Sequence, residues 1–500
     1  IISVQFFSGV NPTAGFIFAL LAFAAGFAVR PFGAIVFGRL GDLVGRKYTF
    51  LVTILIMGLA TFIVGLLPNY ETIGFAAPAI LILLRLAQGL AIGGEYGGAA
   101  IYVAEHAPHG KRGSYTSWIQ TTATLGLFMS LLVILACRLS MSKEGFESWG
   151  WRIPFLLSIF LLGISVWIRL KLNESPLFQK MKEEGTLSKS PLKESFGEWG
   201  NLKIVLIALI GLTAGQAVVW YTGQFYALFF LTQVLKVDAQ IANILIGLGL
   251  LLGVPFFVVF GMLSDRIGRK PIILAGCLLA ALTYFPLFAG LTHYANPALE
   301  AAQKQSPVTV IADPSSCSFQ FNPVGTAAFT TPCDVAKSAL AQRGVSYDNR
   351  RLAPGEETRI AVGETIIVSF DASDDEGGGR RAAFNAELSA ALAEAGYPAF
   401  ANPDEINYPM VVLILFILVL YATMVYGPIA AMLVELFPTR IRYTSMSLPY
   451  HLGNGWFGGF LPTVSFAIVA ATGNLYSRLW SPFAIAATTF VIGLIFVPDT

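Results

Sequence analysis

The chain has 500 residues, of which 55% are hydrophobic and 12% are charged, about half the charged share of soluble proteins. Its apolar residues fall in blocks of roughly 20 to 30, the length that crosses about 30 Å of hydrocarbon. A formal net charge of +2 leaves no large basic surface for nucleic acid. The composition excludes an ordinary set of soluble domains and predicts an all-α polytopic membrane protein.

Eleven apolar blocks predict eleven spanning helices. The first five lie near residues 13–37, 48–68, 75–104, 114–139 and 150–171. The other six lie near 203–233, 238–263, 271–292, 409–435, 443–471 and 477–498. These blocks divide the chain into an N-terminal half (1–172), a central loop (173–202), three helices of a C-terminal half (203–292), a polar insert (293–408) and three further helices (409–500).

Basic residues in the short loops predict the orientation of the helices. Sixteen of them lie in loops at one end of the bundle, within 38–47, 111–112, 171–203, 266–270 and 440–442. Three lie in short loops at the other end, namely Lys143, Lys236 and Arg478. Because Lys and Arg concentrate in cytoplasmic loops, we expect the first end to be cytoplasmic and the insert to lie outside.

A repeat in the sequence predicts two homologous halves. The loop residues Gly38, Asp42, Gly45, Arg46 and Lys47 recur 223 residues later as Gly261, Asp265, Gly268, Arg269 and Lys270. In the same way Glu105 and Arg112 are matched by Glu435 and Arg442. The two Asp-to-Glu separations are 63 and 170 residues, and their difference of 107 is close to the length of the insert. One predicted helix precedes the first repeated loop and two precede the second, so we expect the first of twelve helices to be absent.

The paired Gly-x-x-x-Asp-x-x-Gly-Arg-Lys loops resemble the signature of the major facilitator superfamily, although Leu43 stands where Arg or Lys is usual. The stretches from Arg85 to Ala99 and from Glu435 to Arg442 are similar to the metabolite:proton symporters, bacterial carriers of carboxylates, shikimate, proline or betaine. The resemblance implies two pseudo-symmetric helical halves and proton-coupled symport of a small carboxylate or zwitterion by alternating access. It also implies a monomer in the bacterial inner membrane, with no cofactor.

The repeated loops predict an inner gate. Asp42 and Asp265 lie where a carboxylate can meet a helix N-terminus or a neighbouring Arg, and such contacts would hold the inner side closed until the halves rock. The alternative is a pair of basic loops that only set topology, although topology needs no Asp at a fixed place. The residues assigned to gating are Gly38, Asp42, Gly45, Arg46, Lys47, Glu105, Arg112, Gly261, Asp265, Arg266, Gly268, Arg269, Lys270, Glu435 and Arg442.

Ionisable residues inside a membrane are costly, which makes them candidates for function. Arg85, Gln88 and Glu95 fall within about 80° of one another on a helix, so we expect them to project together into the cavity between helices. Arg85 suits a carboxylate ligand and Glu95 a proton, whereas the alternative is an Arg–Glu pair that only orders the bundle. The set assigned to the solute and proton path is Arg30, Arg85, Gln88, Glu95, Gln216, Trp220, Tyr221, Gln224, His451 and Asn454. The neutral, aromatic and His members could equally be packing contacts.

The insert predicts a small domain with fifteen acidic and eight basic residues, a net charge of −7. Cys317 and Cys333 both lie in it, so we expect a disulfide. Alternation over Thr358–Ser369 predicts a strand, and residues 381–395 look helical. The acidic stretch 371–376 lacks the spacing of an EF-hand, so we expect a solvated loop and no metal site.

Two other classes of function remain open. No nucleotide-binding motif occurs, which removes ATP-driven pumping by this chain. A sensor or receptor could use the carrier fold and the insert to bind a ligand without transport, and saturable uptake would exclude it. A membrane enzyme acting through the insert ranks last, because no Ser/His/Asp or metal-ligand constellation is recognisable there.

Overall fold

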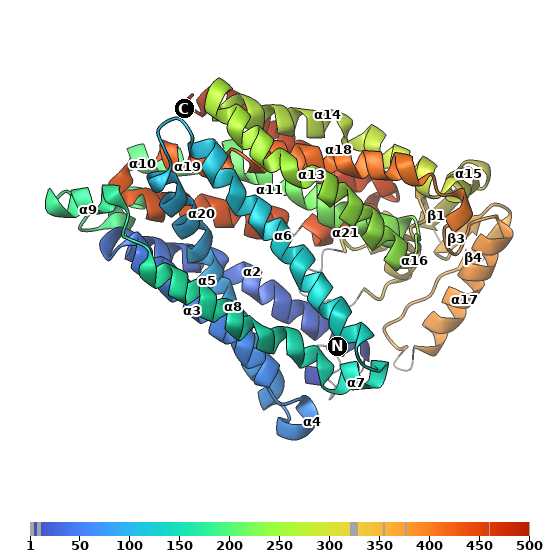
Figure 1. The fold of residues 1–500 in the computed structure, drawn as a ribbon. Helices are drawn as coiled ribbons and strands as arrows, with labels where there is room; N and C mark the ends of the chain where they lie inside the picture. Colours follow the sequence, from blue (N-terminus) through green and yellow to red (C-terminus); the bar gives the residue numbers. More distant parts are fainter. Residues whose placement is uncertain are drawn as a thin grey trace.

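The computed structural model describes residues 5–7, 12–320, 329–353, 356–375, 378–459 and 461–499, with the backbone alone at 12–25, 131 and 461–466. It is a bundle of long helices in two groups (Figure 1). Among the described residues, nine helices are long and apolar enough to cross a membrane. Helices suit lipid because they satisfy their own backbone hydrogen bonds.

The first group, the N-terminal half, contains five long helices. They are α2 (Pro12–Leu43), α3 (Arg46–Leu66), α5 (Ala76–His106), α6 (Arg112–Leu139) and α8 (Ile153–Lys171), with short α4 (Tyr70–Ile73) and α7 (Lys143–Ser148) between them. The central loop then forms α9 (Pro176–Glu183) and a π-helical turn at Lys193–Gly197.

The second group, the C-terminal half, contains six long helical segments, five of which are among those nine. The first, Trp199–Val234, joins α10 (Trp199–Ala208), α11 (Ala214–Tyr221) and α12 (Ala227–Phe229) through π-helical turns. Then come α13 (Ala239–Ile267), α14 (Arg269–Ala295), α18 (Tyr408–Tyr426) with α19 (Ile429–Leu436), α20 (Arg442–Leu452) with α21 (Leu461–Thr472), and α22 (Trp480–Phe496). Every span predicted from the sequence falls on one of these helices.

Two glycines set the turns of the repeated loops. Gly45, with φ 137°, separates α2 from α3, and Gly268, with φ 94°, separates α13 from α14. Side chains disfavour these backbone conformations, which explains why glycine occurs at both equivalent positions. We call the end of the bundle that carries these loops the basic end, and the opposite end the insert end. The two halves lie together at the basic end and spread apart toward the insert end (Figure 1).

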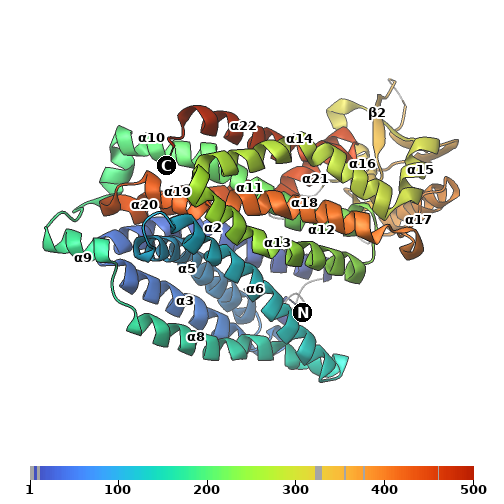
Figure 2. The ribbon, with the colours of Figure 1, turned by 45° about the horizontal axis from the view of Figure 1, so that its top comes forward.

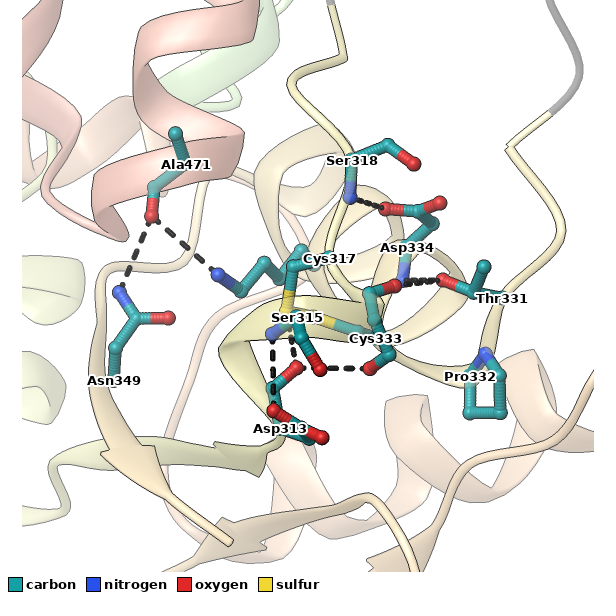
Figure 3. Close-up of a disulfide and its surroundings, with 12 residues drawn as sticks. Asp313, Ser315, Cys317, Ser318, Thr331, Pro332, Cys333, Asp334, Asn349 and Ala471 are labelled. Atoms are coloured by element: carbon teal, nitrogen blue, oxygen red, sulfur yellow. Dashed lines mark hydrogen bonds between the residues drawn. A yellow bond between two sulfur atoms is a disulfide. The ribbon is translucent and has the colours of Figure 1, made fainter.

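The insert lies at one end of the C-terminal half (Figure 2). It contains a four-stranded sheet of order β2-β1-β3-β4. β1 (Val308–Ala312) pairs parallel with β2 (Tyr347–Arg351) and antiparallel with β3 (Arg359–Val362), which pairs antiparallel with β4 (Thr365–Val368). Its helices are α15 (Pro297–Gln305), α16 (Pro332–Arg343) and α17 (Gly379–Glu394). A disulfide joins Cys317 to Cys333, the pair expected from the sequence (Figure 3).

One expectation for the insert was wrong. Residues 358–369 do not form one strand, because Gly363, with φ 56°, turns the chain back and makes a hairpin of β3 and β4. The predicted helix is α17. In the acidic stretch before it, Asp375 accepts hydrogen bonds from the backbone N–H groups of Arg380 and Arg381 at 3.1 and 3.0 Å. That carboxylate therefore caps the first turn of α17.

Candidate functional site

At the basic end, each half places an aspartate at the start of a helix in the other half. Asp42 of α2 accepts hydrogen bonds from the backbone N–H groups of Tyr443 and Thr444, at 3.3 and 2.8 Å, at the start of α20. Asp265 of α13 accepts from Gly113 and Ser114, both at 2.8 Å, at the start of α6. A carboxylate at a helix N-terminus satisfies free N–H groups and complements the helix dipole. The repeat in the sequence is thus a repeat of one contact between the halves.

An ion-pair cluster surrounds the first aspartate. The Arg46 guanidinium lies 3.3 Å from Asp42, and both side chains have 0% exposure. Arg46 also donates to the backbone oxygen of Thr439 in the other half at 2.7 Å. Arg442 donates to Glu105 at 2.8 Å, again between the halves. Because these charges are removed from water, loss of one partner would leave another charge stranded.

The second cluster repeats the first with more water around it. Arg269 lies 3.0 Å from Asp265 and 3.2 Å from Glu435, and Arg112 lies 3.6 Å from Glu435. The Arg112 side chain is 36% exposed, whereas the equivalent Arg442 is 9% exposed. The two equivalent clusters therefore differ in strength, since exposed ion pairs contribute little.

The remaining repeated residues pack the ends of the helices. A Cβ atom at Gly38 would lie 2.9 Å from the Thr444 Cα, and one at Gly261 would lie 2.6 Å from the Ser117 side chain. Both glycines therefore allow close contact between the halves. Lys47 donates to the Leu170 oxygen at the end of α8, and Lys270 donates to the Val497 oxygen after α22. Arg266 is exposed.

Tyr443 adds a contact that the sequence analysis did not anticipate. Its buried ring lies against Gly41 of α2, where a Cβ atom would come within 1.9 Å of it. The glycines Gly94, Gly97 and Gly98 of α5 are also near it, and its hydroxyl donates to the Gly94 oxygen at 2.7 Å. A side chain of the C-terminal half therefore fills a glycine-lined socket in the N-terminal half. The equivalent position in the repeat is Gly113, so this plug exists on one side only.

The central loop covers the first cluster. Glu174 accepts hydrogen bonds from the backbone N–H groups of Arg46 and Lys47 at 3.2 Å, and the Ser175 hydroxyl donates to Glu105. Glu194 of the central loop pairs with Arg440 of the C-terminal half at 3.1 Å. These residues could not be predicted from the sequence, because they lie in a polar loop that has no repeat and no regular spacing.

Farther along the bundle, polar and aromatic side chains of both halves meet. Arg30, near the middle of α2, lies over the Phe27 ring at 3.8 Å, is hydrogen-bonded to the Tyr221 hydroxyl and lies near the hydroxyls of Tyr450 and Tyr426. Tyr96 of α5 stacks on Tyr450 with ring centroids 3.6 Å apart. The partners of Arg30 in the described part are thus hydroxyls, which leaves its charge without a carboxylate.

Three residues of the C-terminal half form a hydrogen-bonded group beside Arg30. Asn454 accepts from the Tyr426 hydroxyl at 2.6 Å and from the Gln216 amide at 3.2 Å. His451 is buried close to Arg30, and neither ring nitrogen has a hydrogen-bond partner among the described residues. The same holds for the Trp220 indole nitrogen and the Gln224 amide nitrogen. These side chains, whose nitrogens lack hydrogen-bond partners, lie on α11, on α20 and on the π-helical turns beside them.

Arg85, Gln88 and Glu95 do not form the single group expected from their spacing. Arg85 donates to Gln88 at 2.9 Å, and Gln88 donates to Thr61 of α3 at 3.0 Å. Glu95 instead interacts with Arg169 of α8. The reason is that α5 turns its glycine side toward α2, where a Cβ atom at Gly93 would lie 2.3 Å from the Arg30 oxygen. Its ionisable side chains therefore face α3 and α8 inside the N-terminal half.

These features define a class: a multi-pass membrane protein of two related halves, joined at one end by equivalent polar contacts, with a shared polar centre. Comparison with known proteins agrees. The family described as sugar (and other) transporter matches residues 15–198. The shikimate transporter of Escherichia coli is 35% identical over 295 residues, 57% of this chain and 65% of that protein. The inner membrane metabolite transport protein YhjE of Escherichia coli is 37% identical over 309 residues, 59% of this chain and 67% of that protein.

A solved structure shows the same fold. It is the major facilitator superfamily proton:xylose symporter XylE with bound 6-bromo-6-deoxy-D-glucose, at a TM-score of 0.62 and 15% identity, covering 98% of this chain and 88% of that one. The chain belongs to the major facilitator superfamily, whose matched members are membrane transporters and not enzymes. It spans less than two thirds of the length of the shikimate transporter.

Proposed function

We propose that this protein is a proton-coupled symporter that moves a small organic carboxylate or zwitterion by alternating access. The observation that carries the proposal is the pair of equivalent contacts at the basic end, Asp42 with α20 and Asp265 with α6. Contacts of this kind join two rigid halves and can be broken together, as rocking of one half against the other requires. The names of the matched shikimate transporter and proton:xylose symporter support the same class of activity.

The solute site we propose lies at the polar centre. Arg30 offers a planar, permanently charged group without a carboxylate partner in the described part, which suits a carboxylate solute. Tyr221, Gln216 and Asn454 supply neutral hydrogen-bonding groups from the other half. A solute held between them would contact both halves, as coupling between binding and rocking requires. The half-buried Glu95 and the buried His451 are the groups that we propose as carriers of the proton.

We propose that the basic end faces the cytoplasm of a bacterial cell and that the insert lies outside the inner membrane. The excess of basic residues at the first end supports this orientation, and so does the disulfide in the insert, since disulfides persist in oxidising compartments. The conformation is then closed toward the cytoplasm and spread toward the outside (Figure 1). The working unit is a single copy in the lipid bilayer.

Uptake by the whole protein in proteoliposomes tests the proposal. Radiolabelled organic acids, betaines and sugars are compared with and without an inward proton gradient. Saturable uptake of a carboxylate that a protonophore abolishes is the expected result. Binding of a solute without uptake under any gradient would instead favour a sensor built on the carrier fold.

A further inference from the structure

The insert is fastened to the end of one membrane helix by its own side chains. The last carbonyl groups of a helix lack partners within the helix. At the end of α21, the Ala470 oxygen accepts from the Tyr347 hydroxyl at 2.7 Å, and the Thr472 oxygen accepts from Asn349 at 2.9 Å. The Ala471 oxygen accepts from Asn349 as well, at 3.4 Å (Figure 3). The insert thus serves as the C-terminal cap of α21.

The backbone approaches closely at the same place. Gly473, with φ 80°, ends the helix, and a Cβ atom there would lie 2.0 Å from the Tyr347 oxygen. The Tyr347 N–H group donates to the Gly473 oxygen at 2.8 Å. The amine of Lys337 in α16 also reaches the Ala471 oxygen, at 3.5 Å. At this junction the backbone of the insert packs directly against the backbone at the end of α21, as two segments do inside one domain.

The insert also holds the ends of the first and third spans of the C-terminal half. After the span that ends at Val234, the Lys236 oxygen accepts from the Ala401 N–H group at 3.0 Å, and the Lys236 amine donates to the Gln342 oxygen at 3.1 Å. Asn296, just after α14, donates to the Leu235 oxygen at 2.8 Å. Asn407, just before α18, donates from its N–H group to Tyr294 at 2.8 Å. The described hydrogen bonds of the insert go to this half or stay within the insert.

Helices of this half are joined a second time at the polar centre. Gln216 of α11, Tyr426 of α18 and Asn454 between α20 and α21 form the hydrogen-bonded group described above. Because the helices are joined both at the insert end and at the polar centre, they cannot tilt against one another. Helices joined at one of these places alone could still tilt about it. We infer that the insert is a brace that makes the C-terminal half one rigid body at the insert end, so that this half rocks as a unit. The rocking itself rests on the proposed function, but the rigidity does not.

Hydrogen exchange of backbone amides, measured without solute, tests the brace. The variant Tyr347→Phe with Asn349→Ala removes side-chain bonds to α21 only. A brace predicts exchange about tenfold faster at residues 469–477 and also about threefold faster at 233–238, because the ends are held together. Arg350→Gln, an exposed position on the same strand, is the matched control and leaves both segments unchanged.

The reciprocal variant guards against a local effect. Lys236→Met removes the bond to Gln342, and a brace predicts faster exchange at 469–477, where nothing was altered. Acceleration confined to the altered end in both variants would overturn the inference, since the contacts would then be independent caps. Because no transport is measured, this failure is distinct from failure of the proposed function.

Discussion

Asp42 and Asp265 lie 223 residues apart and make the same contact in opposite directions, each carboxylate receiving two backbone N–H groups at the start of a helix in the other half. Their surroundings differ. Asp42 and its partner Arg46 are fully buried, whereas the second cluster includes an Arg that is 36% exposed. The closure at the basic end is therefore symmetric in geometry and unequal in energy.

Substitution of the two aspartates tests this inequality. Asn keeps the shape of the side chain but removes its charge and turns one acceptor into a donor facing N–H groups. We expect Asp42→Asn to weaken the closure by about 3 kcal/mol, because the fully buried Arg46 then keeps only the more distant carboxylate of Glu105, 3.9 Å away. Asp265→Asn should cost less, since Arg269 keeps Glu435. Hydrogen exchange at residues 440–448 and 111–117 measures both effects, and Arg39→Gln, at an exposed position in the last turns of α2, is the control. Equal effects of the two variants would contradict the inequality.

A double-mutant cycle separates a buried pair from an exposed one. Glu105 and Arg442 are buried and 2.8 Å apart. Each single change to Gln should lower the stability of the purified protein by more than half of the loss caused by the double change. The expected coupling is about 2 kcal/mol. The equivalent pair Glu435 and Arg112 should couple by less than about 1 kcal/mol. Thermal unfolding in detergent gives both values, and a stronger coupling in the second pair would refute the ranking.

The Tyr443 socket can be tested from both sides. Tyr443→Phe removes one hydrogen bond and should reduce uptake by no more than about threefold. Gly41→Leu fills the socket, so the closed state at the basic end should become inaccessible and uptake should fall at least about tenfold. The double variant Gly41→Leu with Tyr443→Ala restores space and should recover part of the uptake. Absence of any recovery would show that Gly41 acts in another way.

Arg30 should decide which solutes are accepted. Arg30→Gln is expected to lower the affinity for carboxylate solutes at least about tenfold, because a charge-assisted pair is lost, while Arg30→Lys keeps part of it. Arg85→Gln is the comparison, since Arg85 bonds to Gln88 inside one half. Binding of labelled solute to the purified protein separates affinity from turnover. If Arg85→Gln proved the more damaging change, the solute site would have to be placed elsewhere.

The sequence predicted the membrane helices and the contacts of the two aspartates, because span length and an exact repeat are properties of the chain alone. It predicted Arg30 as a candidate for the same reason, since a charge inside a span is conspicuous. The prediction that Arg85 and Glu95 project together into the cavity between helices was wrong. Their angular spacing is fixed by the helix, but the direction of that face depends on which neighbour the glycines of α5 admit.

Residues whose partners lie far away in the sequence could not be recognised from the sequence in this way. The sequence contains many aromatic residues, and nothing in it distinguishes Tyr443 from the others. Its role follows from its contact with the glycines at 41, 94, 97 and 98, which only the fold brings together. Glu174 and Ser175 lie in a polar loop whose fold follows from contact with Arg46 and Glu105. In the insert, α15, α16, β1 and β2 are short elements whose patterns were too brief to separate from loop.

The most direct test of the account is a distance across the basic end, between spin labels at the exposed positions 39 and 266 in the two halves of the protein in lipid. If the two aspartate contacts close the basic end, one short distance is expected without solute. A second, longer population is expected when a transported carboxylate is added at acidic pH, and Asp42→Asn should shift the protein to that population. A single distance that stays unchanged while solute is bound, in both the unsubstituted protein and the variant, would contradict it.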